Sequence, residues 1–438
     1  MEKKVSRRQF LKSTGAVVAG AAVGTSLMGL SGCATAGGGA AGAAQGAAGF
    51  GGWAPSSPSP IFDAINIGSL ALKNRMLLGA MNKRRATTDG NPTPSLMREF
   101  NTLAAGGAAM LITGLTYILK EDQFASTPSG FYDDSQIPLY RELTDGVHRN
   151  GSKICIQLVV NGSRTSFNIE NRRTFAPAPL TDPSSGVVVT AGMTREEIRE
   201  LIDAHVRAAL RSREAGFDAV QFHFANNYQV CKFFAPYFNT RTDEYGGPDI
   251  ANRARFGFEI AEAVRRAMGR DYPLLVKMNG PDFFGRRGNT QDEINFIAQG
   301  LRDRGIDAIE VSGGTNFQVR DRNIVRYILN EEDQNYFARS TRAIGEGTNV
   351  PLVMTGGVRN VVMMERALRQ IPNLVAFSMA RTLLAEPDLP FKWQQDTSYT
   401  PKCTSCNWCH GTRWVDGIEV SLQCIFRKDP GFPRPAGT

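Results

Sequence analysis

Short apolar runs alternate with longer amphipathic segments over most of the chain. Eight of the runs have the length of a buried strand, and each leads on to a segment with helical spacing. The runs occupy residues 76–78, 110–113, 154–157, 219–222, 274–278, 308–312, 352–355 and 374–378. Helices are predicted near 95–105, 139–149 and 194–215, and the capping box Thr194-Arg-Glu-Glu197 opens the last of these.

This order of elements predicts the fold class. Eight strands, each followed by a helical segment, favour an α/β fold of the (β/α)8 type, a TIM barrel, over an open doubly wound sheet. No Gly-x-Gly-x-x-Gly follows a predicted strand, so a dinucleotide-binding Rossmann unit has no support. We expect the barrel over residues 61–395 and a short cysteine-rich extension over residues 396–438.

The first 60 residues belong outside this fold. A basic start and an Ala/Gly-rich stretch identify residues 1–32 as a targeting segment. Ser6-Arg-Arg-Gln-Phe-Leu-Lys12 resembles a twin-arginine export signal, and Leu30-Ser-Gly-Cys33 resembles a lipoprotein box. Cys33 would then be lipidated and anchor an exported protein to the membrane, whereas an ordinary cleavage site with an incidental cysteine is the alternative. Residues 33–60, rich in Gly, Ala, Ser and Pro, predict a flexible tether.

Charge and cysteine distribution exclude two classes of protein, the nucleic-acid-binding proteins and the small disulfide-rich domains. The 438 residues carry a formal charge of +8, without a Lys/Arg block beyond the amino terminus, so we expect no nucleic-acid interface. Four of the seven cysteines crowd into the last tenth of the chain, which is not the disulfide framework of a small secreted domain.

Polar side chains cluster where the strand at 219–222 ends. His223 and Asn226 supply two hydrogen-bond donors, and Tyr228 adds a phenol two residues later. Donors that converge on one oxygen polarise a carbonyl, and a nearby phenol supplies a proton. Because the sites of such barrels lie at the carboxyl ends of the strands, these residues are the candidate catalytic group. A histidine with a structural role is the alternative.

Two later strand ends predict a phosphate site. Gly356 and Gly357 follow the seventh strand, where backbone N–H groups can approach a ligand closely. Arg381 follows the eighth strand and can grip a phosphate with two donors. A phosphorylated cofactor is therefore expected, although an enzyme acting on a sugar phosphate would show the same residues.

The extension predicts a metal site. Its spacing is Cys403-x2-Cys406-x2-Cys409-x14-Cys424. Four thiolates satisfy either a [4Fe–4S] cluster or Zn²⁺, and the compact first three favour the cluster. Zinc, and free or disulfide-bonded cysteines, are the alternatives.

From about Ile61 to Trp393 the chain resembles the old yellow enzyme family of FMN-dependent ene-reductases. Four stretches carry the resemblance: His223-x2-Asn226-x-Tyr228, Arg241-Thr-Asp-Glu-Tyr-Gly-Gly247, Asn252-Arg-Ala-Arg-Phe256 and Glu386-Pro-Asp-Leu389. The cysteine spacing is similar to the branch that includes trimethylamine dehydrogenase and the enoate reductases.

The resemblance implies a role for each matching residue. His223 and Asn226 would bind the activating oxygen of a substrate with a C=C bond. Tyr228 would protonate the carbon alpha to the activated group after hydride transfer from flavin N5 to the beta carbon. Gln157 would pair with the flavin pyrimidine edge and Lys277 would lie beside N1 and O2. Gly356, Gly357 and Arg381 would hold the FMN phosphate. The remaining implied flavin contacts are Met81, Asn82, Gly114 and Ala380.

Three positions depart from the family pattern. Asn82 replaces the usual Thr, Ala80 the usual Pro, and Ala380 the usual Gly, which affects the expected flavin potential and substrate pocket. We expect electrons to come from a redox partner through the cluster, because NAD(P)H is not expected outside the membrane. The alternatives are a dehydrogenase of an amine or alcohol that passes electrons outward, and an electron-transfer subunit without a substrate.

Overall fold

The computed structural model describes most of the barrel and part of the extension. The described residues are 58–125, 127–162, 175–181, 188–282, 284–314, 325–410, 412–415, 418–421 and 423–427. The chain divides into two compact units, residues 1–44 and 45–438, and every described residue belongs to the second. The predicted export signal, the lipidation site Cys33 and nearly all of the predicted tether lie outside the described residues.

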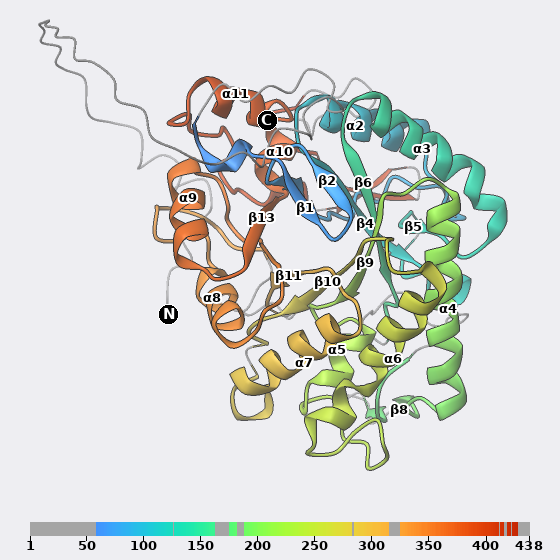
Figure 1. Ribbon diagram of the computed structural model, residues 1–438. Coiled ribbons are helices and arrows are strands. Elements are labelled where there is room, and N and C mark those ends of the chain that lie inside the picture. Colours follow the sequence, from blue (N-terminus) through green and yellow to red (C-terminus); the bar gives the residue numbers. More distant parts are fainter. Residues whose placement is uncertain are drawn as a thin grey trace, which may run out of the picture. The chain divides into compact units, whose positions relative to one another are not determined.

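Eight parallel strands form a closed barrel in the described part of the chain (Figure 1). They are β3 (Met76–Leu78), β4 (Met110–Tyr117), β6 (Lys153–Val159), β9 (Ala219–Phe224), β10 (Leu274–Asn279), β11 (Ala308–Ser312), β12 (Leu352–Met354) and β13 (Leu374–Met379). Strand β3 pairs with both β4 and β13, which closes the sheet. The predicted (β/α)8 fold and its eight strands are therefore confirmed.

Helices surround the barrel, with α2, α3, α4 and α6 on one side of Figure 1 and α7, α8 and α9 on the other. The helices are α2 (Pro94–Ala105), α3 (Ile137–Arg149), α4 (Arg195–Glu214), α5 (Gln229–Phe234), α6 (Ile250–Met268), α7 (Gln291–Asp303), α8 (Ala338–Gly347), α9 (Val361–Gln370), α10 (Arg381–Ala385) and α11 (Leu389–Gln395). The predicted capping box forms: the Thr194 hydroxyl accepts from Glu197 N–H, and the Glu197 carboxylate accepts from Thr194 N–H at 2.8 Å. None of the helices in the described part is long and apolar enough to cross a membrane.

A hairpin that the sequence pattern did not predict covers one end of the barrel. Strands β1 (Ile65–Ile67) and β2 (Leu70–Leu72) pair antiparallel. Ile67, Leu70 and Leu72 share a buried cluster with side chains from the amino-terminal halves of the barrel strands, including Met110 and Leu275. This apolar plug closes the amino-terminal end, so the carboxyl ends of the strands form the open mouth.

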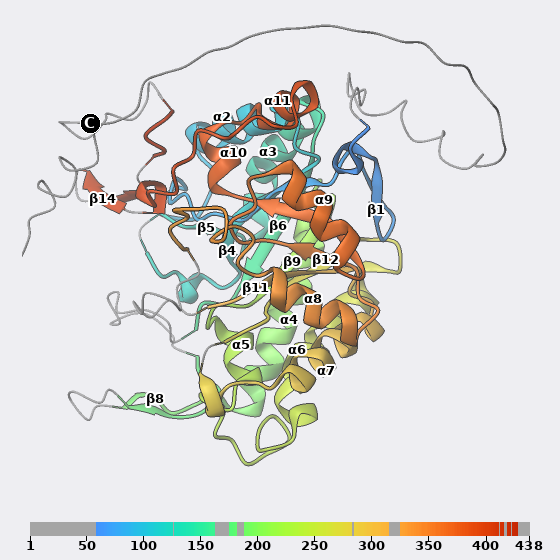
Figure 2. The ribbon, with the colours of Figure 1, turned by 90° about the vertical axis from the view of Figure 1, so that its left-hand side faces the viewer.

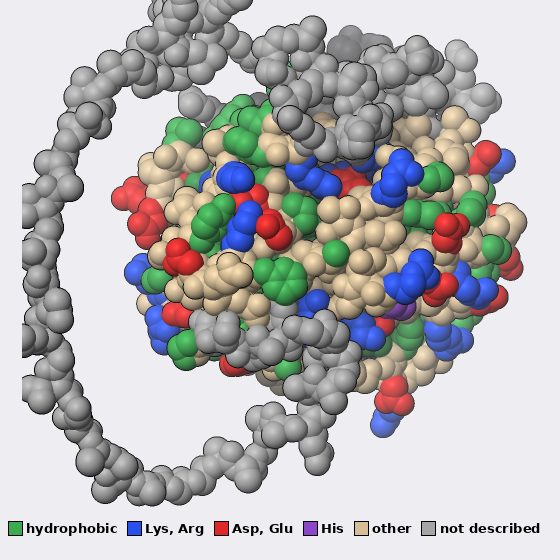
Figure 3. Space-filling model, turned by 90° about the horizontal axis from the view of Figure 1, so that it is seen from above, with side chains coloured by type: hydrophobic (Ala, Val, Ile, Leu, Met, Phe, Trp, Pro, Cys, Tyr) green, Lys and Arg blue, Asp and Glu red, His purple; other side chains and the backbone are tan. Residues whose placement is uncertain are grey.

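Shorter elements complete the described chain. They are η2 (Pro60–Phe62), η3 (Lys120–Asp122), η4 (Asp134–Gln136), η5 (Gly285–Arg287), η6 (Trp408–His410), β5 (Ser129–Gly130), β7 (Leu180–Thr181), β8 (Val188–Thr190), β14 (Thr412–Val415) and β15 (Ile418–Ser421). The hairpin β14–β15 belongs to the extension (Figure 2). Acidic and basic side chains are interspersed on the face shown in Figure 3.

The start of the extension is fixed to the barrel by Glu386. One oxygen of this carboxylate accepts hydrogen bonds from Lys392 Nζ at 2.8 Å and from the Tyr399 hydroxyl at 2.6 Å. The other accepts the N–H of Lys402 at 2.5 Å, one residue before the first extension cysteine. Glu386 is only 3% exposed. The family-like run Glu386-Pro-Asp-Leu389 therefore directs the chain toward the cysteines.

Candidate active site

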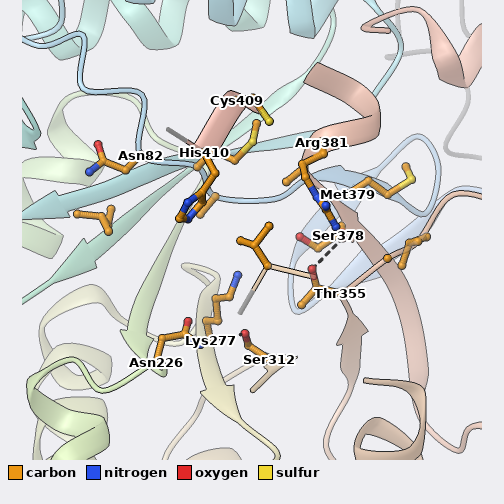
Figure 4. Close-up of a pocket in the computed structure, with 18 of the residues that line it drawn as sticks. Asn82, Asn226, Lys277, Ser312, Thr355, Ser378, Met379, Arg381, Cys409 and His410 are labelled. Atoms are coloured by element: carbon orange, nitrogen blue, oxygen red, sulfur yellow. Dashed lines mark hydrogen bonds between the residues drawn. The ribbon is translucent and has the colours of Figure 1, made fainter. Parts of the chain in front are cut away.

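A cavity of about 400 Å³ opens at the carboxyl ends of the barrel strands. Residues within or just after all the strands from β9 to β13 line it, together with residues within or after β3, β4 and β6. The extension contributes Cys403, Ser405, Cys409 and His410 to its wall. In Figure 4, Cys409 and His410 lie on the opposite side of the cavity from Asn226 and Lys277. The cavity is therefore shared between the barrel mouth and the extension.

A tight turn after β9 brings the three predicted catalytic residues together. Asn226 and Asn227 adopt left-handed backbone conformations, with φ of 57° and 62°, which asparagine tolerates better than most residues. The Asn226 N–H donates to Asn279 Oδ1 at 3.0 Å, which fixes the turn to the end of β10. The His223 and Tyr228 rings then lie with their centroids 4.3 Å apart, and both line the cavity while being 6% exposed.

The side-chain amide of Asn226 is directed toward the loop after β11. Its Nδ2 donates to Gly313 O at 3.2 Å and lies 3.4 Å from both Ser312 Oγ and Asn279 Oδ1. Asn226 still lines the cavity. The predicted donation to a substrate oxygen therefore requires this amide to turn from Gly313 toward the cavity.

Four polar side chains inside the barrel form a connected row beneath the mouth. Gln157 Nε2 donates to Gln221 Oε1 at 2.7 Å, and Gln221 Nε2 donates to Glu310 Oε2 at 2.8 Å. Lys277 Nζ donates to Glu310 Oε1 at 3.0 Å. Gln157 and Lys277 line the cavity, whereas Gln221 and Glu310 are fully buried behind them. The row orients an amide and a cation toward any ligand in the mouth.

Sequence reasoning identified Gln157 and Lys277 but missed Gln221 and Glu310. Both missed residues interrupt otherwise apolar strands, and this was the only available signal. Which of these polar side chains meet across the barrel depends on the register of the parallel pairs, in which Gln157 faces Gln221 and Lys277 faces Glu310.

The predicted phosphate residues gather at the ends of β12 and β13. Gly356 and Gly357 have φ of 93° and 82°, and a Cβ on Gly356 would lie 2.6 Å from the Phe337 ring. A side chain at this position is therefore excluded by both conformation and space. Arg381 lines the same region and donates from Nη1 to Arg326 O at 2.8 Å and to Asn407 Oδ1 at 2.5 Å.

Three further residues at this end were missed by the sequence analysis. Arg359 donates to Ser405 Oγ at 3.1 Å and to the carbonyl of Cys403, so it joins the glycine loop to the extension. The buried hydroxyls of Ser378 and Thr382 line the cavity and have no hydrogen-bond partner among the described residues. Buried polar groups are costly without partners, so these hydroxyls and the glycine loop fit a phosphate-bearing cofactor.

The other predicted flavin contacts differ in placement. Met81, Asn82 and Ala380 line the cavity. Gly114 does not line it but lies behind its wall, where an added Cβ would be 2.3 Å from Met81 O. Gly114 therefore permits close packing of β4 against the segment that carries Met81.

The four extension cysteines are free thiols, and Cys406 is the exposed one among them. Cys403 and Cys424 are buried together beside Leu384 and Ala385, and Cys409 packs against them. Burial, together with the charge effects of Cys424 and Cys403, raises the pKa of Cys409 to about 11. In the ranges that the structure describes, however, no group of three or more His, Cys, Asp or Glu side chains is arranged to hold a metal ion. The donor set suits a metal, but the arrangement shown is not a closed metal centre.

Positive charge surrounds these thiols. Glu99 lies between three cations, at 3.2 Å from Lys83 Nζ, 3.1 Å from Arg85 Nη1 and 3.5 Å from Arg427 Nη1. Lys83 acts against burial by lowering the pKa of Cys409. One carboxylate cannot balance three cations, so the local field favours an anionic group.

Comparison with known proteins shows which protein family the chain matches. Residues 60–399 match the model of the NADH:flavin oxidoreductase / NADH oxidase family, and residues 4–24 match that of the twin-arginine translocation pathway signal sequence. A metal reductase from Desulforamulus reducens is 30% identical over 351 residues, which cover 80% of this chain and 51% of that protein. An NADPH dehydrogenase from Clostridium acetobutylicum is 30% identical over 328 residues, covering 75% of this chain and 92% of that protein.

Comparison with solved structures agrees with this family match. The old yellow enzyme homologue from Zymomonas mobilis superposes with a TM-score of 0.66 at 26% identity, covering 78% of this chain and 94% of that one. The chain thus spans nearly all of two of these relatives but about half of the metal reductase. The family match ends at residue 399, before the four cysteines.

Proposed function

The chain belongs to the NADH:flavin oxidoreductase / NADH oxidase family, and from this membership we propose that it is an FMN-dependent ene-reductase of the old yellow enzyme type. The proposal is carried by one observation: His223, Asn226 and Tyr228 meet at the cavity above the row formed by Gln157 and Lys277. The substrate would be a small molecule with an activated C=C bond.

Different cavity residues would bind different parts of the cofactor. Arg381, Arg359 and the Gly356-Gly357 turn would hold the phosphate, with the hydroxyls of Ser378 and Thr382 as further donors. The amide of Gln157 would meet the pyrimidine edge, and Lys277 would lie beside N1 and O2. Met81, Asn82 and Ala380 would shape the remaining wall, and Gly114 would support Met81 from behind. Bound FMN supplies the hydride, which amino-acid side chains cannot provide.

The protein's own groups would then bind and protonate the substrate. His223, and Asn226 once its amide has turned from Gly313, would donate hydrogen bonds to the activating oxygen, and both bonds would strengthen as negative charge develops there. The Tyr228 hydroxyl gives its proton to the carbon next to the activated carbonyl. The low exposure of all three side chains limits the access of water to this step.

We also propose that Cys403, Cys406, Cys409 and Cys424 hold a [4Fe–4S] cluster, with zinc as the lesser possibility. The spacing of four free thiols, three of which pack together, and the surplus of positive charge support it. Cys403 and Cys409 border the same cavity as the flavin residues, so electrons would enter from a redox partner by this route.

The amino terminus supports a location outside the cytoplasm. The twin-arginine signal indicates export across the membrane, and we propose that Cys33 carries a lipid anchor. NAD(P)H would not be the electron donor there. The NADPH dehydrogenase among the relatives makes a nicotinamide donor the competing proposal.

The test begins with protein purified anaerobically. We expect FMN released on denaturation, about four iron per chain, and reoxidation of the dithionite-reduced flavin by enones, enoates or nitroalkenes. Zinc without iron would reject the cluster. Reoxidation by none of these acceptors would reject the ene-reductase, and reduction of the flavin by an amine or alcohol would favour the dehydrogenase.

Two cysteine variants separate the extension from the barrel. Cys409→Ser should lose iron and retain FMN, because only the extension is altered. Cys155→Ala is the matched control, since Cys155 is a buried thiol of β6 inside the barrel, and it should retain both. Loss of iron from both variants would indicate that the thiols act through folding and not as ligands.

A further inference from the structure

Two arginines connect the mouth of the barrel with the first cysteines of the extension. Arg359 Nη1 donates to Ser405 Oγ at 3.1 Å, and Arg359 Nη2 donates to the carbonyl of Cys403. Arg381 Nη1 donates to Asn407 Oδ1 at 2.5 Å. Both arginines also line the cavity, where they belong to the proposed phosphate site. Each side chain therefore borders the phosphate site and the extension at the same time.

The backbone of the cysteine segment, residues 403–409, is unusual where the arginines contact it. Ser405 and Asn407 have φ of 56° and 60°, in the left-handed region that residues with a Cβ seldom adopt. These are the two residues whose side chains accept hydrogen bonds from the arginines. The exposed Cys406 lies between them. Such a backbone persists only where surrounding contacts enforce it, so the two guanidinium groups help to shape the cysteine segment.

The two guanidinium groups also act on each other. Burial lowers the pKa of Arg359, and the charge of Arg381 acts in the same direction. None of the described residues that line the cavity is a carboxylate, so no acidic side chain of the lining offsets this repulsion. A phosphate monoester carries a charge of about −1.5 to −2 at pH 7 and accepts several hydrogen bonds. A phosphate at this site would therefore stabilise both cations and restrict their side chains.

The shape of a guanidinium allows one arginine to contact the phosphate and the cysteine segment together. The group is planar and carries five N–H donors in a rigid fork. Arg381 reaches both Asn407 Oδ1 and the carbonyl of Arg326 through Nη1. The edge formed by Nε and Nη2 faces another direction in the same plane and has the spacing for two phosphate oxygens. An anion that fixes this edge also fixes the direction of Nη1.

We propose that Arg359 and Arg381 link the two sites, so that binding of the flavin phosphate holds the cysteine segment in its folded form. The link rests on the proposed FMN site and adds a conformational consequence to it. Riboflavin has the same ring system but no phosphate, and it should occupy the cavity without this effect. The two arginines are then positioning residues for the extension thiols.

Hydrogen–deuterium exchange of the full-length protein tests the link. After removal of the flavin, the cysteine segment should exchange about 10-fold more slowly with saturating FMN than with saturating riboflavin, a typical size for coupling between two sites. Inorganic phosphate alone should give part of this protection. The peptide of α4, which contributes nothing to the cavity lining, is the internal control and should exchange equally in all states.

Variants of Arg359 separate the link from general support of the fold. Arg359→Met should lose most of the difference between FMN and riboflavin, and Arg359→Lys should keep part of it because the charge remains. Arg342→Met removes an exposed charge of α8 that pairs with Glu346, and it should keep the full difference. A full difference in Arg359→Met would overturn the role of Arg359.

The outcomes distinguish the link from the proposed function. Equal protection of the cysteine segment by FMN and riboflavin in the parent would overturn the link and leave the FMN site standing. Failure of FMN to bind would instead reject the proposed function. Slower exchange of the segment with inorganic phosphate alone would, in that case, still support a link between an anion and the thiols.

Discussion

The barrel mouth and the cysteine extension border the same cavity, but different forces hold them. The side chains of the mouth lie at the ends of the barrel strands. The hydrogen-bond ladders of the sheet and the buried polar row hold them in place. The extension is joined to the barrel by side-chain contacts from Glu386, Arg359 and Arg381 to its first part. Three of its four thiols, those of Cys403, Cys409 and Cys424, pack together without forming a closed metal site among the described residues.

This difference shows which geometry the polypeptide determines by itself. A barrel mouth is preorganised, because each strand end is positioned by neighbours on both sides. A cysteine site of this kind gains much of its order from the metal it binds, since metal binding and folding are coupled. Changes in the mouth should therefore affect chemistry and flavin, whereas changes in the extension should affect iron and local stability.

The largest effect is expected from Tyr228→Phe, which keeps the ring and removes the acid. Oxidation of the reduced flavin by an enone should slow by about 10²–10⁴-fold, the usual contribution of a proton donor. A nitroalkene gives a product that is stable without this proton, so it should be reduced at nearly the parent rate. Iron content should not change. Stopped-flow reoxidation measures both rates, and equal slowing of both acceptors would assign Tyr228 a packing role.

Gly356→Ala should weaken FMN binding by about 10- to 100-fold. The added Cβ would crowd the Phe337 and Tyr336 rings and strain a left-handed backbone. Gly269→Ala is the matched control: Gly269 is also left-handed, but a Cβ there meets nothing within 4 Å. Fluorescence titration of the apoprotein with FMN measures the difference. Equal weakening in both variants would show that strain alone, and not the glycine loop at the cavity, controls binding.

Glu310→Gln should raise the reduction potential of the flavin by about 30–60 mV. The change keeps the shape of the buried row but removes the negative charge beside Lys277, so a reduced anionic flavin becomes more stable. Glu244→Gln removes an exposed carboxylate on the surface and should leave the potential unchanged. Spectroelectrochemical titration gives both values, and an unaltered potential in Glu310→Gln would show that the flavin does not sense this row.

The most local effect is expected from Glu386→Gln, which should lower the stability of the extension by about 1–3 kcal/mol. Burial opposes ionisation of Glu386, but its bonds to Lys392, Tyr399 and Lys402 outweigh this, so its pKa lies below the ordinary 4.5. A lowered pKa stabilises the fold above pH 4.5, and this contribution is lost as the pH falls through the folded-state value.

Limited proteolysis of the extension at several pH values tests this prediction. The parent should become more susceptible below pH 4.5, while Glu386→Gln should be susceptible already at pH 7 and respond less to acid. FMN content should be retained at neutral pH, because the barrel mouth is untouched. Identical proteolysis profiles for parent and variant would show that Glu386 does not hold the extension.

The order of strands and helices was predictable from the sequence because it depends on local periodicity. Apolar runs of strand length and the capping box at Thr194 are visible in any unfolded chain, and so are the two-glycine turn and the cysteine spacing. His223, Asn226 and Tyr228 were identifiable for the same reason, since they follow one another closely. The family-like residue Arg241 was visible too, but its hydrogen bonds to the carbonyls of Pro177 and Met193 indicate a structural role.

Contacts between distant segments were decided only by the tertiary structure. The pairing of Gln221 with Glu310 depends on strand register, and the Thr127 hydroxyl donates to the carbonyl of Arg84, which lies 43 residues away. The link from Arg359 to the cysteine loop likewise spans 46 residues to Ser405. A sequence fixes which groups are present and how neighbours along the chain are spaced. The closure of the barrel determines which of those groups meet, because only the folded backbone brings the ends of eight strands to one cavity.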